Sequence, residues 1–437
     1  MKPLNTQQLV GLRNLHTWLT WLASPFLLVV TLTGMLYALN PQIEWWQTSH
    51  LTSVQGKGTS LPLNALVEAG QSHMQPGYTL HSATIPANPH TQSQQLNWIP
   101  VENKTHAENR GEHAGHGGSG MRKSGRPAFV LPDNALIQYV NPHNGSVIGQ
   151  MALADQFAQW SKHLHSRLLA GKALRWVSEL AATALFWMLV TGVWLWALGP
   201  TVSQHKSRLK RWHIGMGLGF AAFTVVMTAT GLTWSEYAGQ QVRTLVKATG
   251  QSAPKIPDKL HSAESSAGQT LWGWNDALAK TRQLAGPVEI LLIPPEPGHN
   301  YWLAIGSNPA EPTHRFDLAL DASDGQILYR STWANQTLFG KATAIGIPFH
   351  RGEFGLWNQL LLMAFGGFVL FALGSAWTLQ FGRRRRNGVW FNPSAEALHR
   401  VLPKSFMAAW LMTSALLPLS LPLGGVVLLL DRIRRQG

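Results

Sequence analysis

The sequence contains no cysteine among its 437 residues. This absence excludes disulfide bonds, zinc sites built from thiolates and iron–sulfur clusters bound by cysteine. Charged residues are also scarce, at 13% of the chain, whereas hydrophobic residues make up 45%. Several of the apolar runs are long enough to cross a membrane, so the composition predicts a membrane protein with more than one domain.

The few charges are unevenly distributed, and basic residues exceed acidic ones by 14. Such an excess can favour nucleic acid, but here the basic clusters stand at the ends of apolar runs, most clearly at Arg383 to Arg386. That placement follows the positive-inside rule of membrane proteins. We therefore expect the lipid bilayer as a partner, no nucleic acid, and a cytoplasmic N-terminus. The first apolar run is too long for a signal peptide and is interpreted as a retained helix.

Two of the apolar runs share a pattern. His16 precedes Gly34 by 18 residues, and His213 precedes Gly231 by the same interval. Both stretches are long enough for a hydrocarbon core of ~30 Å at ~1.5 Å per helical residue. An ionisable residue at the same depth in two spans usually faces the bundle interior and has a function.

The order of apolar and polar segments predicts a mainly α-helical membrane protein. It has four main transmembrane helices in two parallel repeats, two external α+β domains and a C-terminal hydrophobic hairpin. A strand–turn–strand pattern recurs at Asn141-Pro142-x-x-Gly145 and Asp321-x-x-x-Gly325. We predict helix 1 over 1–39, external domain 1 over 40–162 with a His- and Gly-rich insertion over 86–126, helix 2 over 163–199, a cytoplasmic loop over 200–211, helix 3 over 212–237, external domain 2 over 238–349, helix 4 over 350–382, a cytoplasmic segment over 383–404, and the hairpin with a basic tail over 405–437.

Two of these segments allow alternatives. The C-terminal apolar stretch contains Pro418 and Pro422 and has basic flanks, which favours a hairpin over a single span. The insertion is rich in polar residues and glycine, and we interpret it as a mobile loop. Its residues His106, His113 and His116 are candidates for weak metal binding, although a polar loop without a ligand is the plainer interpretation.

Four histidines fall into two layers under this topology. His16 and His213 begin the outward helices, and His165 and His350 precede the inward ones. Each histidine alone is compatible with an interfacial position, but their repetition favours two pairs of axial imidazoles for metal-centred macrocycles. His163 competes with His165 as the ligand. Because the outer pair lies beyond a ~20-residue span, either the site is at the membrane surface or the helices bend near Gly171, Gly352 and Gly355.

The chain resembles the PepSY-associated transmembrane family, and within it the FoxB-type bis-haem iron–siderophore reductases of bacterial inner membranes. The resemblance covers most of residues 10–390. It rests on His16 with Thr33-Gly34, on Leu164-His165-x-x-Leu168-x-x-Gly171, on Arg211-x-His213 with Thr230-Gly231, on His350-x-Gly352-x-x-Gly355, and on the two turn motifs. It implies two haem b groups held by the four histidines, periplasmic external domains and electron delivery to ferric siderophores.

No flavodoxin-like or nicotinamide-binding segment follows the fourth helix, so we expect a separate electron donor, either a quinol or a cytoplasmic reductase. Arg167 and Arg351, together with Trp160, are expected either to dock the ferric siderophore or, for the arginines, to pair with haem propionates. Two other functions remain open. One is a PepSY-type binding or regulatory protein without redox activity. The other is a metal transporter, for which only Glu179 offers a carboxylate near a span.

Overall fold

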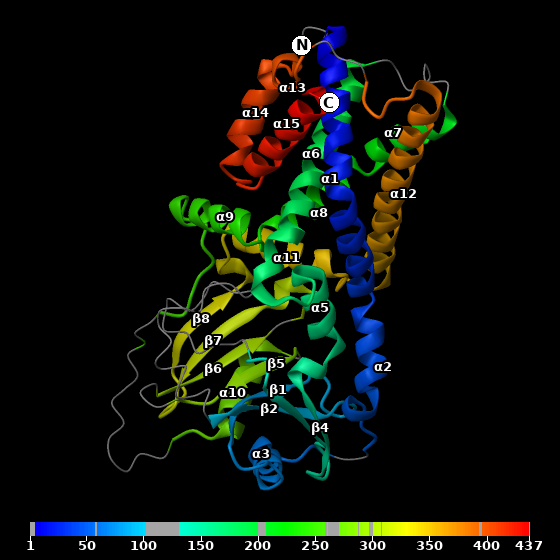
Figure 1. Cartoon of the computed structure of the whole chain (residues 1–437). Coiled ribbons are helices and arrows are strands. Elements are labelled where there is room, and N and C mark those ends of the chain that lie inside the picture. The colour runs from blue at the N-terminus through cyan, green and yellow to red at the C-terminus, as the bar shows by residue number, and fades with distance from the viewer. Residues whose placement is uncertain are drawn as a thin grey trace. The chain divides into compact units, whose positions relative to one another are not determined.

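The chain folds into two compact units. The structure is a computed structural model (Figure 1), and it describes residues 5–56, 59–101, 131–199, 207–257, 260, 271–286, 288–296, 300–306, 308–392 and 396–436. The helical unit comprises Met1–Leu39, Ser161–Gly250 and Phe349–Gly437, and the sheet unit comprises Asn40–Trp160 and Gln251–Pro348. Each unit therefore takes segments from both halves of the chain.

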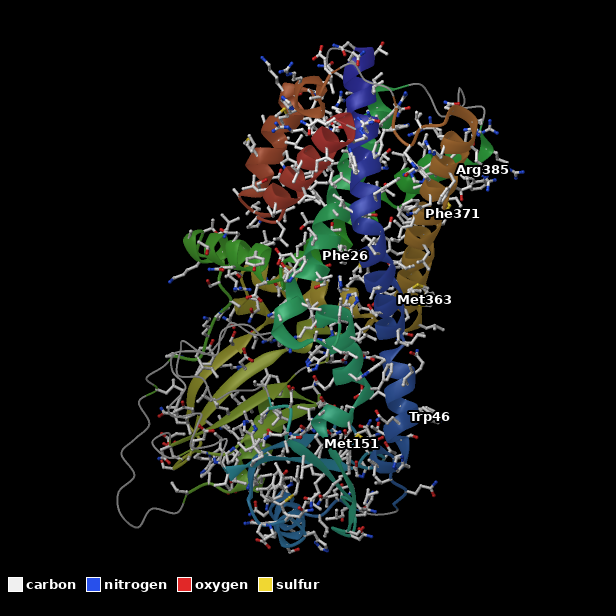
Figure 2. All side chains as sticks on the ribbon, viewed as in Figure 1. Phe26, Trp46, Met151, Met363, Phe371 and Arg385 are labelled. Carbon is white, nitrogen blue, oxygen red and sulfur yellow. The ribbon has the colours of Figure 1, made fainter. Side chains whose placement is uncertain are left out.

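Three helices of the helical unit are long and apolar enough to cross a membrane: α1 (Thr6–Ala38), α6 (Arg175–Leu198) and α12 (Leu356–Asn387). At ~1.5 Å per residue each is long enough for a ~30 Å hydrocarbon core. α1 begins at a capping box in which Asn5 and Gln8 exchange side-chain-to-backbone hydrogen bonds. Figure 2 shows Met363, Phe371 and Arg385 in succession along α12, which ends in basic residues.

The third predicted helix is broken. It consists of α7 (Arg208–Gly219) and α8 (Ala221–Leu232), which meet at Phe220 with a bend of 57°. Glycine weakens a helix by roughly 1 kcal/mol relative to alanine, and α7 ends in the glycine-rich sequence GMGLG. The prediction of one continuous helix over 212–237 was therefore wrong. Over the described residues there are three unbroken candidate spans, or four if the bent pair counts as one.

The second and fourth predicted helices are also interrupted, near their N-terminal ends. α5 (Phe157–Arg167) is separate from α6, and α11 (Leu338–Arg351) is separate from α12. Left-handed backbone conformations stand in both gaps, with φ of 51° at Leu168, 60° at Leu169, 68° at Gly171, 80° at Gly352 and 85° at Gly355. Helices do not continue through such residues. The breaks thus occur at the glycines where a bend was expected from the sequence.

The C-terminal segment packs into the core of the helical unit. α13 (Leu398–Val401) precedes α14 (Lys404–Ser414) and α15 (Ser420–Gln436), which contact each other across a turn at 415–419. Trp187 of α6 stacks on Trp410 of α14 with ring centres 4.0 Å apart, and its Nε1 donates to Ser420 Oγ at 2.9 Å. This arrangement is the predicted hairpin and not a single continuous helix.

Glu179 is buried inside α6 and has a structural partner. Its two carboxylate oxygens accept the backbone N–H groups of Tyr237 and Ala238 at 2.9 and 2.8 Å. These groups belong to the first turn of α9 (Tyr237–Ala248), where a helix has N–H groups without intrahelical partners. The carboxylate that the transporter alternative required therefore caps a helix.

The sheet unit contains one antiparallel sheet with the order β4-β3-β2-β1-β5-β6-β7-β8 over the described residues. Its strands are β1 (Tyr78–Ile85), β2 (Gln94–Pro100), β3 (Leu136–Val140), β4 (Val147–Ala152), β5 (Ile290–Ile293), β6 (Tyr301–Gly306), β7 (Phe316–Asp321) and β8 (Ile327–Thr332). Because β1 pairs with β5, the two predicted external domains share this sheet. Their inner edge strands are thereby paired and not exposed.

β2 corrects a second prediction, because it lies within the predicted 86–126 insertion. Leu96 and Trp98 of β2 are buried and alternate with Gln95 and Asn97, which is the pattern of a strand. The remainder of that insertion from residue 102 onward, with His106, His113 and His116, lies outside the described residues.

The two halves of the sheet repeat each other. α3 (Leu63–Ser72) and α10 (Trp274–Ala285) cover the same face, and Asn64 and Asn275 each donate a backbone N–H to the other's side-chain oxygen, at 3.1 and 3.2 Å. The predicted turns are confirmed, with φ of 74° at Gly145 and 68° at Gly325.

On the other face of the sheet, α2 (Asn40–Thr52) contributes Leu51 to an apolar cluster. Short 3-10 helices occupy Leu153–Asp155, Gly171–Leu174, Pro312–His314 and Trp333–Asn335.

Candidate functional site

The structure brings two of the four predicted histidines close together inside the helical unit. His16 lies on α1 and His213 on α7, and their ring centres are 6.4 Å apart with the ring planes at 90°. A metal bound at ~2 Å by one nitrogen of each imidazole would hold the ring centres ~6 Å apart. The separation is therefore suited to a metal between the two rings.

Each of the four histidines has a hydroxyl oxygen beside its Nδ1. The pairs are His16 with Thr191 at 2.8 Å, His165 with Thr33 at 3.2 Å, His213 with Ser375 at 2.7 Å, and His350 with Thr230 at 2.9 Å. In the first half of the chain, α1 carries one histidine and one threonine, and their partners lie on α6 and on the preceding helix α5. In the second half, the bent pair α7 and α8 carries one histidine and one threonine, and their partners lie on α12 and on the preceding helix α11. The repeat thus extends to individual hydrogen bonds.

The hydroxyls also determine which ring nitrogen carries the proton. Each donates its own proton to a backbone carbonyl of its helix: Thr191 to Trp187 at 2.8 Å, Thr33 to Val29 at 2.8 Å, Thr230 to Val226 at 2.7 Å and Ser375 to Ala372 at 3.0 Å. A hydroxyl has one proton, so towards the imidazole it accepts from Nδ1–H. Nε2 is then left with the lone pair that a metal binds.

The glycine after each threonine leaves room for the ring. A Cβ at Gly34 would lie 3.0 Å from His165 Cε1, one at Gly231 would lie 3.4 Å from His350 Cε1, and one at Gly192 would lie 3.7 Å from His16 Cε1. The Thr-Gly dipeptide therefore has two functions in the packing: the threonine accepts from Nδ1–H and the glycine admits the imidazole. Next to His213 the order is reversed, as Gly374-Ser375.

His165 and His350 lie on α5 and α11, outside the candidate spans, and influence each other electrostatically. Burial lowers the pKa of His350 to about 4, and the charges of His165 and Arg351 act in the same direction. Burial also lowers the pKa of His165. Both imidazoles are therefore neutral at physiological pH, as metal ligands must be. It is His165, and not His163, whose ring lies against Thr33.

The two predicted arginines differ in their surroundings. Arg351 forms an ion pair with Glu353, and its side chain is 45% exposed. The Nε of Arg167 is buried and has no hydrogen-bond partner among the described residues. A buried guanidinium nitrogen without a partner is costly, so Arg167 is the better candidate for holding an anionic group. Trp160 is exposed and packs on Phe157, with ring centres 5.6 Å apart.

Two residues near the histidines were not predicted from the sequence. Ser375 belongs to no Thr-Gly motif, although it follows a glycine as a mirror of that motif. Tyr37 stacks on His165 with ring centres 6.3 Å apart and an interplanar angle of 6°. Its only sequence signal was its place three residues after Gly34. No cluster of three or more metal-binding side chains of His, Cys, Asp or Glu occurs in the described part of the chain.

Comparison with family models and with curated proteins gives the following result. No curated protein matches the chain. The family model of the PepSY-associated TM region, however, matches residues 13–384, a range that includes all four histidines and the whole eight-stranded sheet. With its apolar helices, the protein is therefore a membrane protein in contact with the lipid bilayer. The chain belongs to the family of the PepSY-associated transmembrane region.

Proposed function

We propose that this protein is a FoxB-type bis-haem reductase that carries electrons across the bacterial inner membrane to ferric iron in the periplasm, with a ferric siderophore as its substrate. His16 and His213 would hold one haem b, and His165 and His350 the other. The observation that carries the proposal is the hydroxyl partner of each of these four histidines, since it fixes the proton on Nδ1 and leaves the Nε2 lone pair for a metal.

The residues present fit such a cofactor. Bound haem would supply a one-electron redox centre whose potential depends on its axial ligands, their hydrogen bonds and burial. Thr191 and Ser375 orient the inner imidazoles, and Thr33 and Thr230 orient the outer ones. Arg167 has a buried Nε that suits a propionate. Two pairs of ligands in one helical unit would let an electron cross from one membrane face to the other.

The direction of transfer follows from the positions of basic residues. α7 begins with Arg208, Lys210 and Arg211, and α12 ends with the cluster Arg384 to Arg386. Under the positive-inside rule these helix ends are cytoplasmic. The segments 40–160 and 251–348 would then be periplasmic, and the His165–His350 pair would be the outer one. The donor on the cytoplasmic side would be a quinol or a cytoplasmic reductase.

A second candidate function has one observation in its favour. The sheet unit is a complete domain with its own apolar core and with a polar pocket on one face. That is what a PepSY-type binding or regulatory module requires, and it does not need the histidines. The four histidine–hydroxyl pairs would have no role in such a protein, which is why we favour the reductase.

The substrate step can be tested by stopped-flow spectroscopy. The purified chain is reduced anaerobically and mixed with a ferric hydroxamate siderophore, and the oxidised spectrum should return with a rate that depends on the chelate concentration. Arg351→Gln should slow this return if Arg351 contacts the chelate. Arg167→Gln should instead change cofactor content or spectrum. A reduced protein that is indifferent to the ferric chelate would contradict the proposal.

A further inference from the structure

The sheet unit has a pocket of about 350 Å³ on the face opposite α3 and α10. It lies at the seam of the two halves of the sheet, where β1 pairs with β2 on one side and β5 on the other. The apolar cluster around Tyr139 and the apolar cluster around Leu303 belong to the same face. Between these clusters the sheet surface is polar.

The floor of the pocket consists of side chains from two paired strands. Ser82 and Thr84 of β1 lie beside Asn97 and Gln95 of β2. The Asn97 amide nitrogen donates to Ser82 Oγ and to Thr84 Oγ1, both at 3.0 Å, which leaves the Asn97 carbonyl oxygen as an acceptor. A sheet face that other elements cover is normally apolar, so these polar residues depart from the usual pattern. Such departures occur mainly at functional sites.

Two carboxylates complete the walls, Glu44 from α2 and Glu289 from the residue before β5. Among the described residues no lysine, arginine or histidine lines the pocket, although the chain as a whole carries a net charge of +14. Desolvation raises the pKa of the Glu289 carboxyl.

The size of the pocket excludes a bare metal ion as a good fit. A water molecule takes ~30 Å³ of liquid, so the space corresponds to roughly ten water molecules and falls in the range of small-molecule sites. The two carboxylates disfavour an anion. Ile137, Leu131 and Leu291 provide apolar surface between the polar groups. The ligand must therefore combine a cationic head with an aliphatic body.

We propose that this pocket binds a small organic ammonium ion, with its cationic group between Glu44 and Glu289 and its hydrogen-bond donors on the Asn97 and Gln95 side chains. The aliphatic part lies against Ile137 and Leu291. The site belongs to the sheet unit alone and uses none of the histidines, so it is independent of the proposed electron transfer.

The test is calorimetric titration of the full chain in detergent with putrescine, a diammonium ion of suitable length, and with butanediol as its neutral analogue. Saturable binding is expected for putrescine and not for butanediol. Glu289→Gln and Glu44→Gln should each weaken binding about ten-fold, because each removes one of the two carboxylate charges that attract the ammonium group. Glu289→Asp keeps the charge and should retain most of the affinity for putrescine.

Glu68→Gln is the matched control, because Glu68 is an exposed residue of α3 on the opposite face of the sheet and the change in net charge is the same. The affinity of Glu68→Gln for putrescine should equal that of the unaltered chain. Size-exclusion elution and thermal unfolding identify any variant that does not fold, and Glu289→Asp then provides the comparison. An absence of saturable heat at millimolar putrescine, or equal affinity in Glu289→Gln and Glu68→Gln, would overturn the proposal.

Discussion

The ring of His213 stands perpendicular to the ring of His16, with the two centres 6.4 Å apart. The two residues come from different halves of the chain and from corresponding helices of the repeat, α1 and α7. A metal held by both Nε2 atoms needs about this separation, so the proposed function assigns both residues to one ligand set. We therefore expect His16→Ala and His213→Ala to lose the same haem and to retain the other.

The complementary variants His165→Ala and His350→Ala should lose the second haem, as measured by the haem content and redox titration of each purified variant. His163→Ala is the control, since it lies on the same helix as His165, whereas the imidazole beside Thr33 Oγ1 is that of His165. The layered pairing is wrong if His16→Ala and His350→Ala remove the same haem.

The hydroxyl partners give a second prediction. Thr191→Val keeps the shape of the side chain but removes the oxygen that accepts from His16 Nδ1–H at 2.8 Å. Loss of such a partner to a metal-ligating histidine typically costs ~10–100-fold in metal affinity or activity. We expect weaker retention of the inner haem and a shifted potential, with an unchanged outer haem. Thr33→Val should do the reverse, and a variant pair that affects both haems equally would argue against separate sites.

The glycines beside the threonines make a graded series. In Gly34→Ala the new Cβ would lie 3.0 Å from His165 Cε1, closer than ordinary contact, so the imidazole must shift. In Gly192→Ala the corresponding distance to His16 is 3.7 Å, which is an ordinary contact. Absorption spectra should therefore change for the outer haem in Gly34→Ala and remain unaltered in Gly192→Ala. Equal effects of the two substitutions would show that these contacts do not matter.

The absence of cysteine makes the topology easy to test, because any introduced cysteine is unique. Gln75→Cys lies in an exposed part of the sheet unit, and Asn387→Cys lies at the exposed basic end of α12. A membrane-impermeant maleimide applied to the periplasmic face should label the first and not the second. Labelling of Asn387→Cys from that face would reverse the direction of electron transfer.

Much of this arrangement was predictable from local patterns. The apolar runs predicted α1, α6 and α12. The turn motifs predicted the two strand pairs whose connecting turns contain Gly145 and Gly325. The repeated spacing between a histidine and a glycine identified the histidines as candidate ligands. These features depend on residues that are near one another in the sequence, so the pattern of apolar and polar residues within one stretch predicts them.

The remainder depends on contacts between distant residues. Thr191 is 175 residues from His16, and the partner of His165 is Thr33 and not a residue of its own helix. The pairing of β1 with β5 likewise joins segments that are far apart, so two predicted domains became one sheet. β2 was missed because it lies in a polar stretch, and the bend at Phe220 was missed because apolar residues continue on both sides of it.

The central claim is that the four histidines hold two haem groups, and the most direct measurement is the haem content of the purified chain by pyridine haemochrome. The account predicts two haem b per chain and sharp bis-imidazole bands on reduction with dithionite, falling to one haem in His16→Ala or His350→Ala. A colourless protein, or a haem content that does not respond to either substitution, would contradict it.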